Sequence, residues 1–93
     1  MKIERDTIIF RSDRSHFGKE REGRKTNTVR WFNLEEEIEF LDHKDKIRKI
    51  RIKSGKSDDM YFERRLTDAT NIGWAMNMRL WVFSWKHREE EKE

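Results

Sequence analysis

The residues whose types and spacing can do chemistry are concentrated in one short segment of the chain. Its sequence is Gly23-Arg24-Lys25-Thr26-Asn27-Thr28-Val29-Arg30. A glycine-initiated turn that holds hydroxyl and amide groups beside cations can cradle a phosphate, a ribose or the edge of a base. The segment therefore predicts a ligand site built from Arg24, Lys25, Asn27, Thr28 and Arg30. The alternative interpretation is an exposed connection between a helix and a strand.

Aromatic side chains near this segment can stack on nucleic acid bases. Trp31 directly follows Arg30, which makes it the preferred stacking candidate, and filling of the core is the other interpretation of this residue. Trp74, Trp81 and Trp85 are weaker candidates. Aromatic residues that repeat with a spacing of two in a strand are more typical of a core than of a base-stacking surface.

A further candidate for ligand binding is Arg64. Strand alternation places Arg64 on the same face as Phe62 and Leu66. A guanidinium that faces a core or a cleft needs an anionic partner, because burying it unpaired is costly. Two interpretations stay open for this side chain. It lines the ligand cleft, or it is a structural residue that turns outward at a bulge or pairs with Glu20 or Asp68.

The segment must be positioned by the elements that precede and follow it. Apolar, β-branched and aromatic runs predict strands over residues 7–10, 28–32, 46–53, 60–70 and 80–85. The last of these is apolar on both faces and belongs in the middle of a sheet. The spacing of the later strands predicts an α+β fold with a mostly antiparallel sheet, curled into a small β-barrel, and one or two short helices.

Both expected helices have recognisable ends. Ser12 or Asp13 offers an N-cap for the first helix, and Gly23 suits the left-handed position that follows its last turn. Asn33 followed by Glu36 predicts a capping box at the start of the second helix. That helix then carries apolar residues at i, i+4 and i+7, which are Leu34, Ile38 and Leu41.

Two stretches of the chain resemble the ASCH domains of the PUA-like superfamily. The first runs from Ile8-Ile9-Phe10 through the first helix to Glu22 and the 23–30 segment, and is similar to small bacterial members with a Gly-Arg-Lys-Thr-x-Thr-x-Arg core. The second, residues 62–70, is similar to the rest of that fold and to small phage-type relatives. The resemblance implies one domain over residues 1–88 with a charged tail at 89–93. It also implies a β-barrel with a cleft beside the first helix, and binding of RNA or modified nucleosides.

The resemblance also implies a possible enzymatic activity. Some close relatives in that family hydrolyse N4-acetylcytidine with a motif lysine, the second motif threonine and a later glutamate, and the first two correspond to Lys25 and Thr28. Arg30 matches the motif arginine, which binds the substrate or braces the turn. No glutamate aligns, because the short segment 71–77 replaces a longer helical insertion of the enzymes. Glu63 is the nearest candidate carboxylate, although strand alternation directs it toward solvent.

The composition excludes several classes of protein. A chain of 93 residues has room for one core only. It contains no cysteine, which excludes disulfides, thiolate zinc sites and a cysteine nucleophile. Its three histidines lack the spacing of metal ligands, no motif indicates a cofactor, and no apolar run approaches the ~20 residues that cross a bilayer. We therefore expect a cytoplasmic protein without a metal, a cofactor or a membrane partner.

Charge is unevenly distributed along the chain, although the net charge is only +3. Residues 46–56 carry six basic side chains and no acidic one, whereas residues 31–45 carry one basic and six acidic side chains. The basic strip predicts attraction to phosphates, and its alternative interpretation is a solvated strand face.

Three functions are consistent with these observations. We prefer a module that binds RNA, a nucleotide or a modified nucleoside at the 23–30 segment. The first alternative is an amidohydrolase that acts on N4-acylated cytidine. The second is a phage-type effector that docks on a protein partner through the acidic and aromatic surface around residues 35–39.

Overall fold

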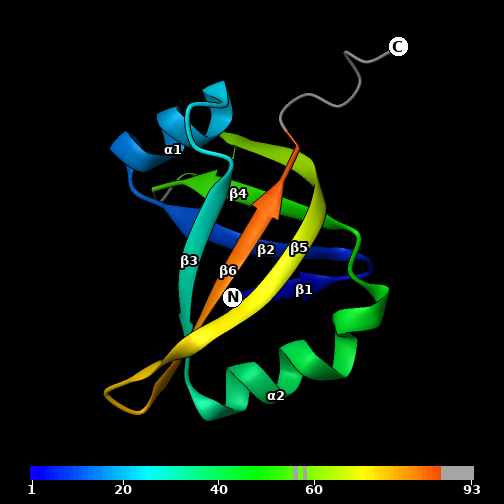
Figure 1. Cartoon of the computed structure of the whole chain (residues 1–93). Helices are drawn as coiled ribbons and strands as arrows, with labels where there is room; N and C mark the ends of the chain where they lie inside the picture. The colour runs from blue at the N-terminus through cyan, green and yellow to red at the C-terminus, as the bar shows by residue number, and fades with distance from the viewer. Residues whose placement is uncertain (56, 58, 87–93) are drawn as a thin grey trace.

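The computed structural model describes residues 1–55, 57 and 59–86, and shows an α+β fold in which one six-stranded sheet curves around a single core (Figure 1). Residues 56, 58 and 87–93 lie outside the described residues, so the end of the expected domain and its tail are not covered. The elements in chain order are β1 (Lys2–Glu4), β2 (Thr7–Ser12), α1 (Arg14–Glu22), β3 (Asn27–Phe32), α2 (Leu34–His43), a 3-10 turn (Lys44–Lys46), β4 (Lys49–Ser54), β5 (Tyr61–Ala75) and β6 (Met78–Trp85).

The strands lie side by side in the order β1-β2-β4-β5-β6-β3. All neighbouring pairs are antiparallel except β2 and β4, which run parallel. The strand β5 pairs with β4 through its first half and with β6 through its second half, with register shifts at two bulges. Bulges bend the strand that carries them, so the two halves of the sheet face each other across the core. As expected, β6 lies inside the sheet, between β5 and β3.

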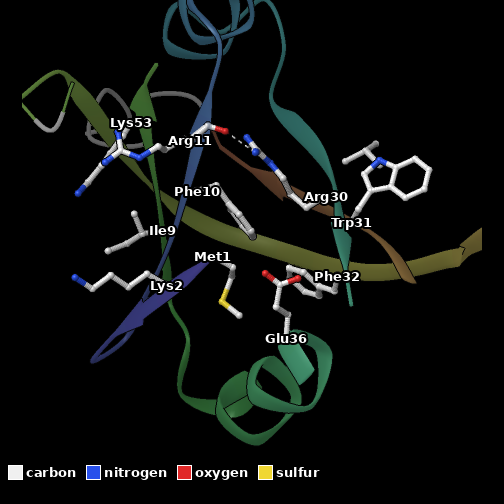
Figure 2. Close-up of a pocket in the computed structure, with 11 residues that line it drawn as sticks. Met1, Lys2, Ile9, Phe10, Arg11, Arg30, Trp31, Phe32, Glu36 and Lys53 are labelled. Carbon is white, nitrogen blue, oxygen red and sulfur yellow. Dashed lines mark hydrogen bonds between the residues drawn. The ribbon is translucent and has the colours of Figure 1, made fainter. Parts of the chain in front are cut away.

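The expected closed barrel was wrong, because the sheet remains open. Its edges are β1 and β3, and no strand pairing joins β3 to β1 or β2 among the described residues. The physical reason is the short strand β1, which the sequence pattern did not predict. It pairs with Thr7 to Ile9 of β2 and so occupies the edge to which β3 would have to add. A side chain bridges the remaining gap instead, since Arg30 Nη1 donates a hydrogen bond of 2.6 Å to the Arg11 carbonyl (Figure 2).

Helix α1 begins and ends where the sequence predicted. The Asp13 carboxylate accepts a hydrogen bond of 2.9 Å from the His16 backbone N–H, and Gly23 adopts φ 89° in the left-handed region. Phe17 is buried on the inner face of the helix, with its ring centroid 5.5 Å from that of Phe62. The caps and this one aromatic anchor fix both the direction and the rotation of the helix.

Helix α2 has the predicted capping box but buries an unexpected face. The Asn33 side chain accepts from the Glu36 N–H, and the Glu36 carboxylate accepts from the Asn33 N–H. The residue that enters the core is Phe40, which is fully buried and packs edge-on against Trp81. The side chains at helical spacing, Leu34, Ile38 and Leu41, are 62%, 51% and 49% exposed. The rotation of this helix is therefore set by Phe40 and not by the periodic apolar residues.

The core is a cluster of aromatic rings between the two halves of the sheet. Phe32 packs against Phe10, Phe40 and Phe83, with ring centroids 5.6 to 6.1 Å apart. Trp81 and Trp85 are 7% and 4% exposed, so they belong to this core and cannot stack on a ligand base. Such tilted and offset ring pairs add stability beyond the area that they bury.

The remaining elements differ from expectation at their ends. The segment 46–53 divides into a 3-10 turn and the strand β4, because the Arg48 and Lys49 N–H groups donate to the Asp6 carbonyl at 2.8 and 3.0 Å.

The strand β5 continues to Ala75 and turns into β6 through Met76 and Asn77, both with positive φ. A turn of this kind usually contains glycine, and neither residue of this turn is glycine, so a hairpin was not predicted there. Over the described residues, no helix is long and apolar enough to cross a membrane.

Gly18 lies in the interior of α1, where a glycine has no conformational role. A methyl group added at this position would meet no atom within 4 Å. We expect Gly18→Ala to raise the free energy of unfolding by about 0.5–1 kcal/mol, because alanine loses less backbone entropy on entering a helix. Urea denaturation measures the change. Gly73→Ala is the matched control and should lower stability, because Gly73 has φ 136°. An unchanged midpoint for Gly18→Ala would contradict the assigned helix.

Candidate functional site

The 23–30 segment connects the end of α1 to β3, and the strand period divides its side chains between two faces. Thr28 is buried and Arg30 is half-buried, whereas Asn27, Val29 and Trp31 point outward. This alternation follows from the antiparallel pairing of β3 with β6, in which Thr28 lies opposite Phe83. Thr28 and Arg30 are thereby directed toward the space under α1.

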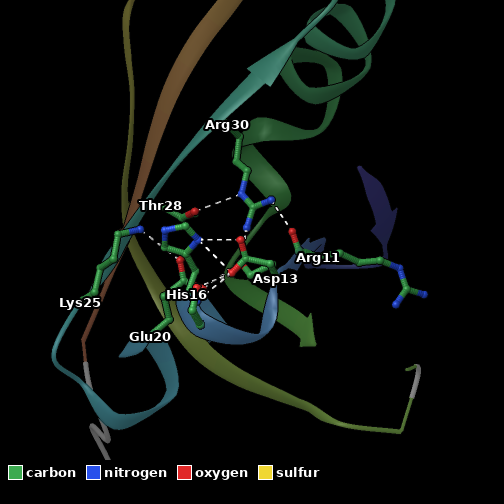
Figure 3. Close-up of polar contacts among 9 residues, drawn as sticks. Arg11, Asp13, His16, Glu20, Lys25, Thr28 and Arg30 are labelled. Atoms are coloured by element: carbon green, nitrogen blue, oxygen red, sulfur yellow. Dashed lines mark hydrogen bonds and ion pairs between the residues drawn. The ribbon is translucent and has the colours of Figure 1, made fainter. Parts of the chain in front are cut away.

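Arg30 is the centre of a hydrogen-bond network (Figure 3). Its Nε donates to Thr28 Oγ1 at 3.1 Å and its Nη2 donates to Ser12 Oγ at 2.7 Å. Its Nη1 bond to the Arg11 carbonyl completes the link from β3 to β2. The guanidinium carbon lies 4.8 Å from the centroid of the Phe10 ring, so one face of the cation rests on the aromatic core.

Burial lowers the pKa of the Arg30 guanidinium from its ordinary value, and the charge of Glu20 opposes that effect. The desolvated cation is held in place by several acceptors and by one nearby carboxylate. Such a buried guanidinium is a fixed part of the structure, because removing it would leave its acceptors without a donor.

Glu20 is the carboxylate at the site, although from the sequence it was expected only as a possible partner for Arg64. Its side chain is 1% exposed. Glu20 Oε2 lies 3.2 Å from Lys25 Nζ, and Glu20 Oε1 accepts a hydrogen bond of 2.9 Å from Ser12 Oγ. The sequence did contain a signal for this burial, because Glu20 follows Phe17 by three residues and therefore lies on the same face of the helix.

Lys25, Thr28 and Arg30 therefore converge on one place, around Glu20. They line a hollow of about 390 Å³ beneath α1, which we call the helix pocket. Its lining consists of Arg11, Ser12, Asp13, His16, Glu20, Lys25, Thr28, Val29 and Arg30. The volume lies in the range of small-molecule sites. All of its lining residues except Val29 carry polar or charged side chains.

Opposite charges are nearly balanced in the helix pocket. The Arg11 guanidinium points away from it and donates to the Gly55 carbonyl at 3.0 Å (Figure 3). Lys25 and Arg30 are then opposed by Glu20 and Asp13. The N–H of His16 and the hydroxyl of Ser15 lower the pKa of Asp13 to about 2, so this carboxylate is ionised near neutral pH. The pocket offers donors and acceptors together, without a strong excess of positive charge.

A second hollow of about 530 Å³ follows the open seam of the sheet, between β3 on one side and β1 and β2 on the other (Figure 2). We call it the seam groove. Phe10 and Phe32 form its apolar wall, and Trp31 stands at its β3 rim, 48% exposed. Its cations are Lys2, Arg11, Arg30 and Lys53. Arg11, Val29 and Arg30 line both hollows, so the two hollows adjoin each other at these residues.

Other predicted site residues lie apart from the helix pocket. Arg24 points into solvent and forms an ion pair of 2.7 Å with Glu22, and Asn27 is exposed on β3. Glu63 lines neither of the two hollows. It forms an ion pair across the sheet with Arg51, and its Oε2 accepts from Arg51 Nε at 2.7 Å. The carboxylate that the structure places beside Lys25 is thus Glu20 and not Glu63.

Arg64 is also outside the two hollows and contacts the end of α1. Its Nη2 donates to the Arg21 carbonyl at 3.1 Å, and its guanidinium carbon lies 4.9 Å from the centroid of the Phe62 ring. A cation at the C-terminal end of a helix interacts favourably with the helix dipole. Arg64 therefore braces α1 against β5, which places it nearer to the structural interpretation than to the ligand-binding one.

The described residues contain no group of three or more histidine and acidic side chains arranged to hold a metal ion. Comparison of the chain with protein-family models, with curated proteins and with solved structures finds no match. The assignment of function therefore rests on the residues of the site.

The Glu20 carboxylate should be important for stability. We expect Glu20→Ala to lower the free energy of unfolding by about 1–3 kcal/mol, because it leaves Ser12 Oγ without its acceptor and removes the charge that faces Lys25 and Arg30. Urea denaturation provides the measurement. Glu22→Ala, which removes an exposed acid from the same helix, is the matched control and should change stability by less than about 0.5 kcal/mol. Equal effects of the two variants would contradict the central position of Glu20.

Proposed function

We propose that this chain binds a nucleoside-containing ligand, with the nucleoside in the helix pocket and the attached phosphates along the seam groove. The observation that carries the proposal is the convergence of Lys25, Thr28 and Arg30 on a polar hollow that also contains the buried carboxylate of Glu20. The resemblance of the first thirty residues to ASCH domains supports the same class of ligand. A PUA-like relationship is part of this proposal.

The charge balance of the helix pocket favours a neutral polar group over a phosphate. A nucleobase edge presents donors and acceptors side by side, and the pocket offers the Lys25 ammonium group beside the Glu20 carboxylate, 3.2 Å apart. A phosphate placed there would face Glu20 and Asp13 as well as the cations. The base is therefore the better occupant of this hollow.

Phosphates are better accommodated in the seam groove, where four cations line the hollow together with one acid, Glu36. There Lys2, Arg11 and Lys53 lie along one side and Trp31 along the other (Figure 2). A cationic track with an aromatic side chain is the usual arrangement for single-stranded nucleic acid. Of the basic strip, Lys53 lines this track, whereas Arg51 is paired with Glu63.

The test is a titration with a fluorescently labelled single-stranded RNA of about eight nucleotides, a length suited to one small domain. Fluorescence anisotropy should show an affinity that falls as salt rises, because phosphate contacts release counterions. Lys25→Ala should weaken binding by at least tenfold, as expected for the loss of a charged hydrogen bond worth about 1.5–3 kcal/mol.

Lys19→Ala is the matched control, because it removes the same charge from an exposed position of α1. It should leave the affinity within about threefold of the wild type, as expected for a distant surface charge. The proposal is wrong if binding does not depend on salt, or if Lys25→Ala and Lys19→Ala have the same effect.

A second candidate function is hydrolysis of N4-acylated cytidine, and one observation favours it. The structure places a carboxylate, Glu20, within 3.2 Å of Lys25 Nζ, although no glutamate aligned with that of the enzymes. A carboxylate beside a lysine and a hydroxyl can accept a proton from an attacking water molecule. Thr28 Oγ1 accepts from Arg30 Nε, so its own proton is directed elsewhere.

The hydrolase hypothesis predicts release of cytidine from N4-acetylcytidine, measured by liquid chromatography. Lys25→Ala and Glu20→Gln should each lower the rate by at least a hundredfold, the range typical of a positioned acid or base. Glu63→Gln is the control and should retain the activity, because Glu63 is bound to Arg51 outside the pocket. Absence of turnover by the wild type, or turnover that survives Lys25→Ala, excludes this function.

A further inference from the structure

A stripe of apolar side chains on α2 faces away from the core. It consists of Leu34, Ile38 and Leu41, which are 62%, 51% and 49% exposed. Their spacing of four and then three residues is that of a helix that packs along a second helix. The helix cannot rotate to bury them, because Phe40 is fixed among core rings and Glu37 Oε2 accepts from Trp81 Nε1 at 2.9 Å.

The apolar surface continues onto the hairpin between β5 and β6, which lies beside the start of α2 (Figure 1). Trp74 on this hairpin is 65% exposed. Trp74 and Leu34, with Asn77 and Arg79, line a hollow of about 390 Å³. The stripe thus has an aromatic wall and a recess at one end, which can receive a large side chain.

The charge around this surface is strongly one-sided. Each residue of the stripe is directly followed by an acid, so that Glu35, Glu39 and Asp42 form a row parallel to it. All three acids are exposed. On the opposite side of the stripe Glu37 forms an ion pair with Arg79, with Oε1 and Nε 3.3 Å apart. An apolar stripe bordered by a row of acids is complementary to a helix that carries the same stripe bordered by cations.

We propose that the α2 stripe and Trp74 form a docking surface for a basic amphipathic helix of a partner protein. The partner helix presents apolar residues at a spacing of three and four, flanked by lysine or arginine. The ten residues of α2 extend about 15 Å, so the contact involves about three turns of the partner. A large apolar side chain of the partner enters the recess beside Trp74.

Charge disfavours the other occupants of this surface. A second copy of the chain, packed stripe to stripe in antiparallel orientation, would set the row of Glu35, Glu39 and Asp42 against its own copy. Like charges placed opposite each other are destabilising. Nucleic acid and anionic lipid are repelled by the same row. The docking surface is therefore distinct in chemistry from the helix pocket and the seam groove.

The test uses two synthetic helical peptides of about fifteen residues, a length at which isolated helices become stable. Both carry leucine at a spacing of three and four, flanked by lysine in one peptide and by glutamate in the other. Anisotropy of the labelled peptides should show binding of the lysine peptide in the micromolar range. At the same concentrations the glutamate peptide should not bind.

Variants of the stripe separate specific docking from general attraction of a basic peptide. Ile38→Ser should weaken binding of the lysine peptide by at least tenfold without lowering the melting temperature, because Ile38 is half exposed. The double variant Glu35→Lys with Glu39→Lys should reverse the preference toward the glutamate peptide. Glu22→Ala, which removes an exposed acid from α1 outside the stripe, is the control and should bind the lysine peptide as the wild type does.

Several results would overturn the proposal. Equal binding of both peptides, or wild-type affinity in Ile38→Ser, would show that the stripe is not recognised. A dimer in sedimentation equilibrium at neutral pH that Ile38→Ser dissociates would assign the surface to a second copy. Weaker binding of single-stranded RNA by Ile38→Ser than by the wild type would assign the surface to nucleic acid.

Discussion

The architecture depends on one half-buried guanidinium, that of Arg30, which joins the edge strand β3 to β2 across the open seam of the sheet. A backbone ladder would normally connect such edges, but β1 already occupies half of the free edge of β2. Arg30 replaces the ladder with hydrogen bonds to the Arg11 carbonyl, Ser12 and Thr28. Because the same cation lies near Glu20, the link across the open seam and the helix pocket share one side chain.

The remaining elements hold α1 and Glu20 in position next to Arg30. The caps of α1 at Asp13 and Gly23 place Glu20 beneath the helix, and Phe17 holds that face against the sheet. Aromatic rings fill the rest of the core, so a chain that is 44% charged still buries enough apolar area. The polar site consequently occupies the boundary between the aromatic core and α1. There charges are partly desolvated, and each is matched by an opposite charge.

Local signals predicted the elements well. The helix ends were predictable from Asp13, Gly23 and the Asn33–Glu36 capping box, because each satisfies backbone groups at a helix end. Tertiary packing and strand pairing could not be predicted from local sequence in the same way. The sequence did not show that β1 would prevent closure of the barrel. It also did not show that Phe40 would set the rotation of α2 in place of the three periodic apolar residues. Lys25, Thr28 and Arg30 were found from their types and spacing. Glu20 was missed because its partner Ser12 lies on another element.

The parallel pairing of β2 with β4 has a consequence for the order in which the chain folds. Between these two strands the chain runs through α1, β3 and α2, so their contact closes a long loop and costs more entropy than a hairpin. The consecutive hairpins from β4 to β6 need no such closure. On a ribosome the N-terminal hairpin emerges first, yet it has no stable neighbour until β4 has been synthesised. We therefore expect β1 and β2 to remain without their final neighbour during synthesis, until the antiparallel strands β4, β5 and β6 provide a surface on which they can assemble.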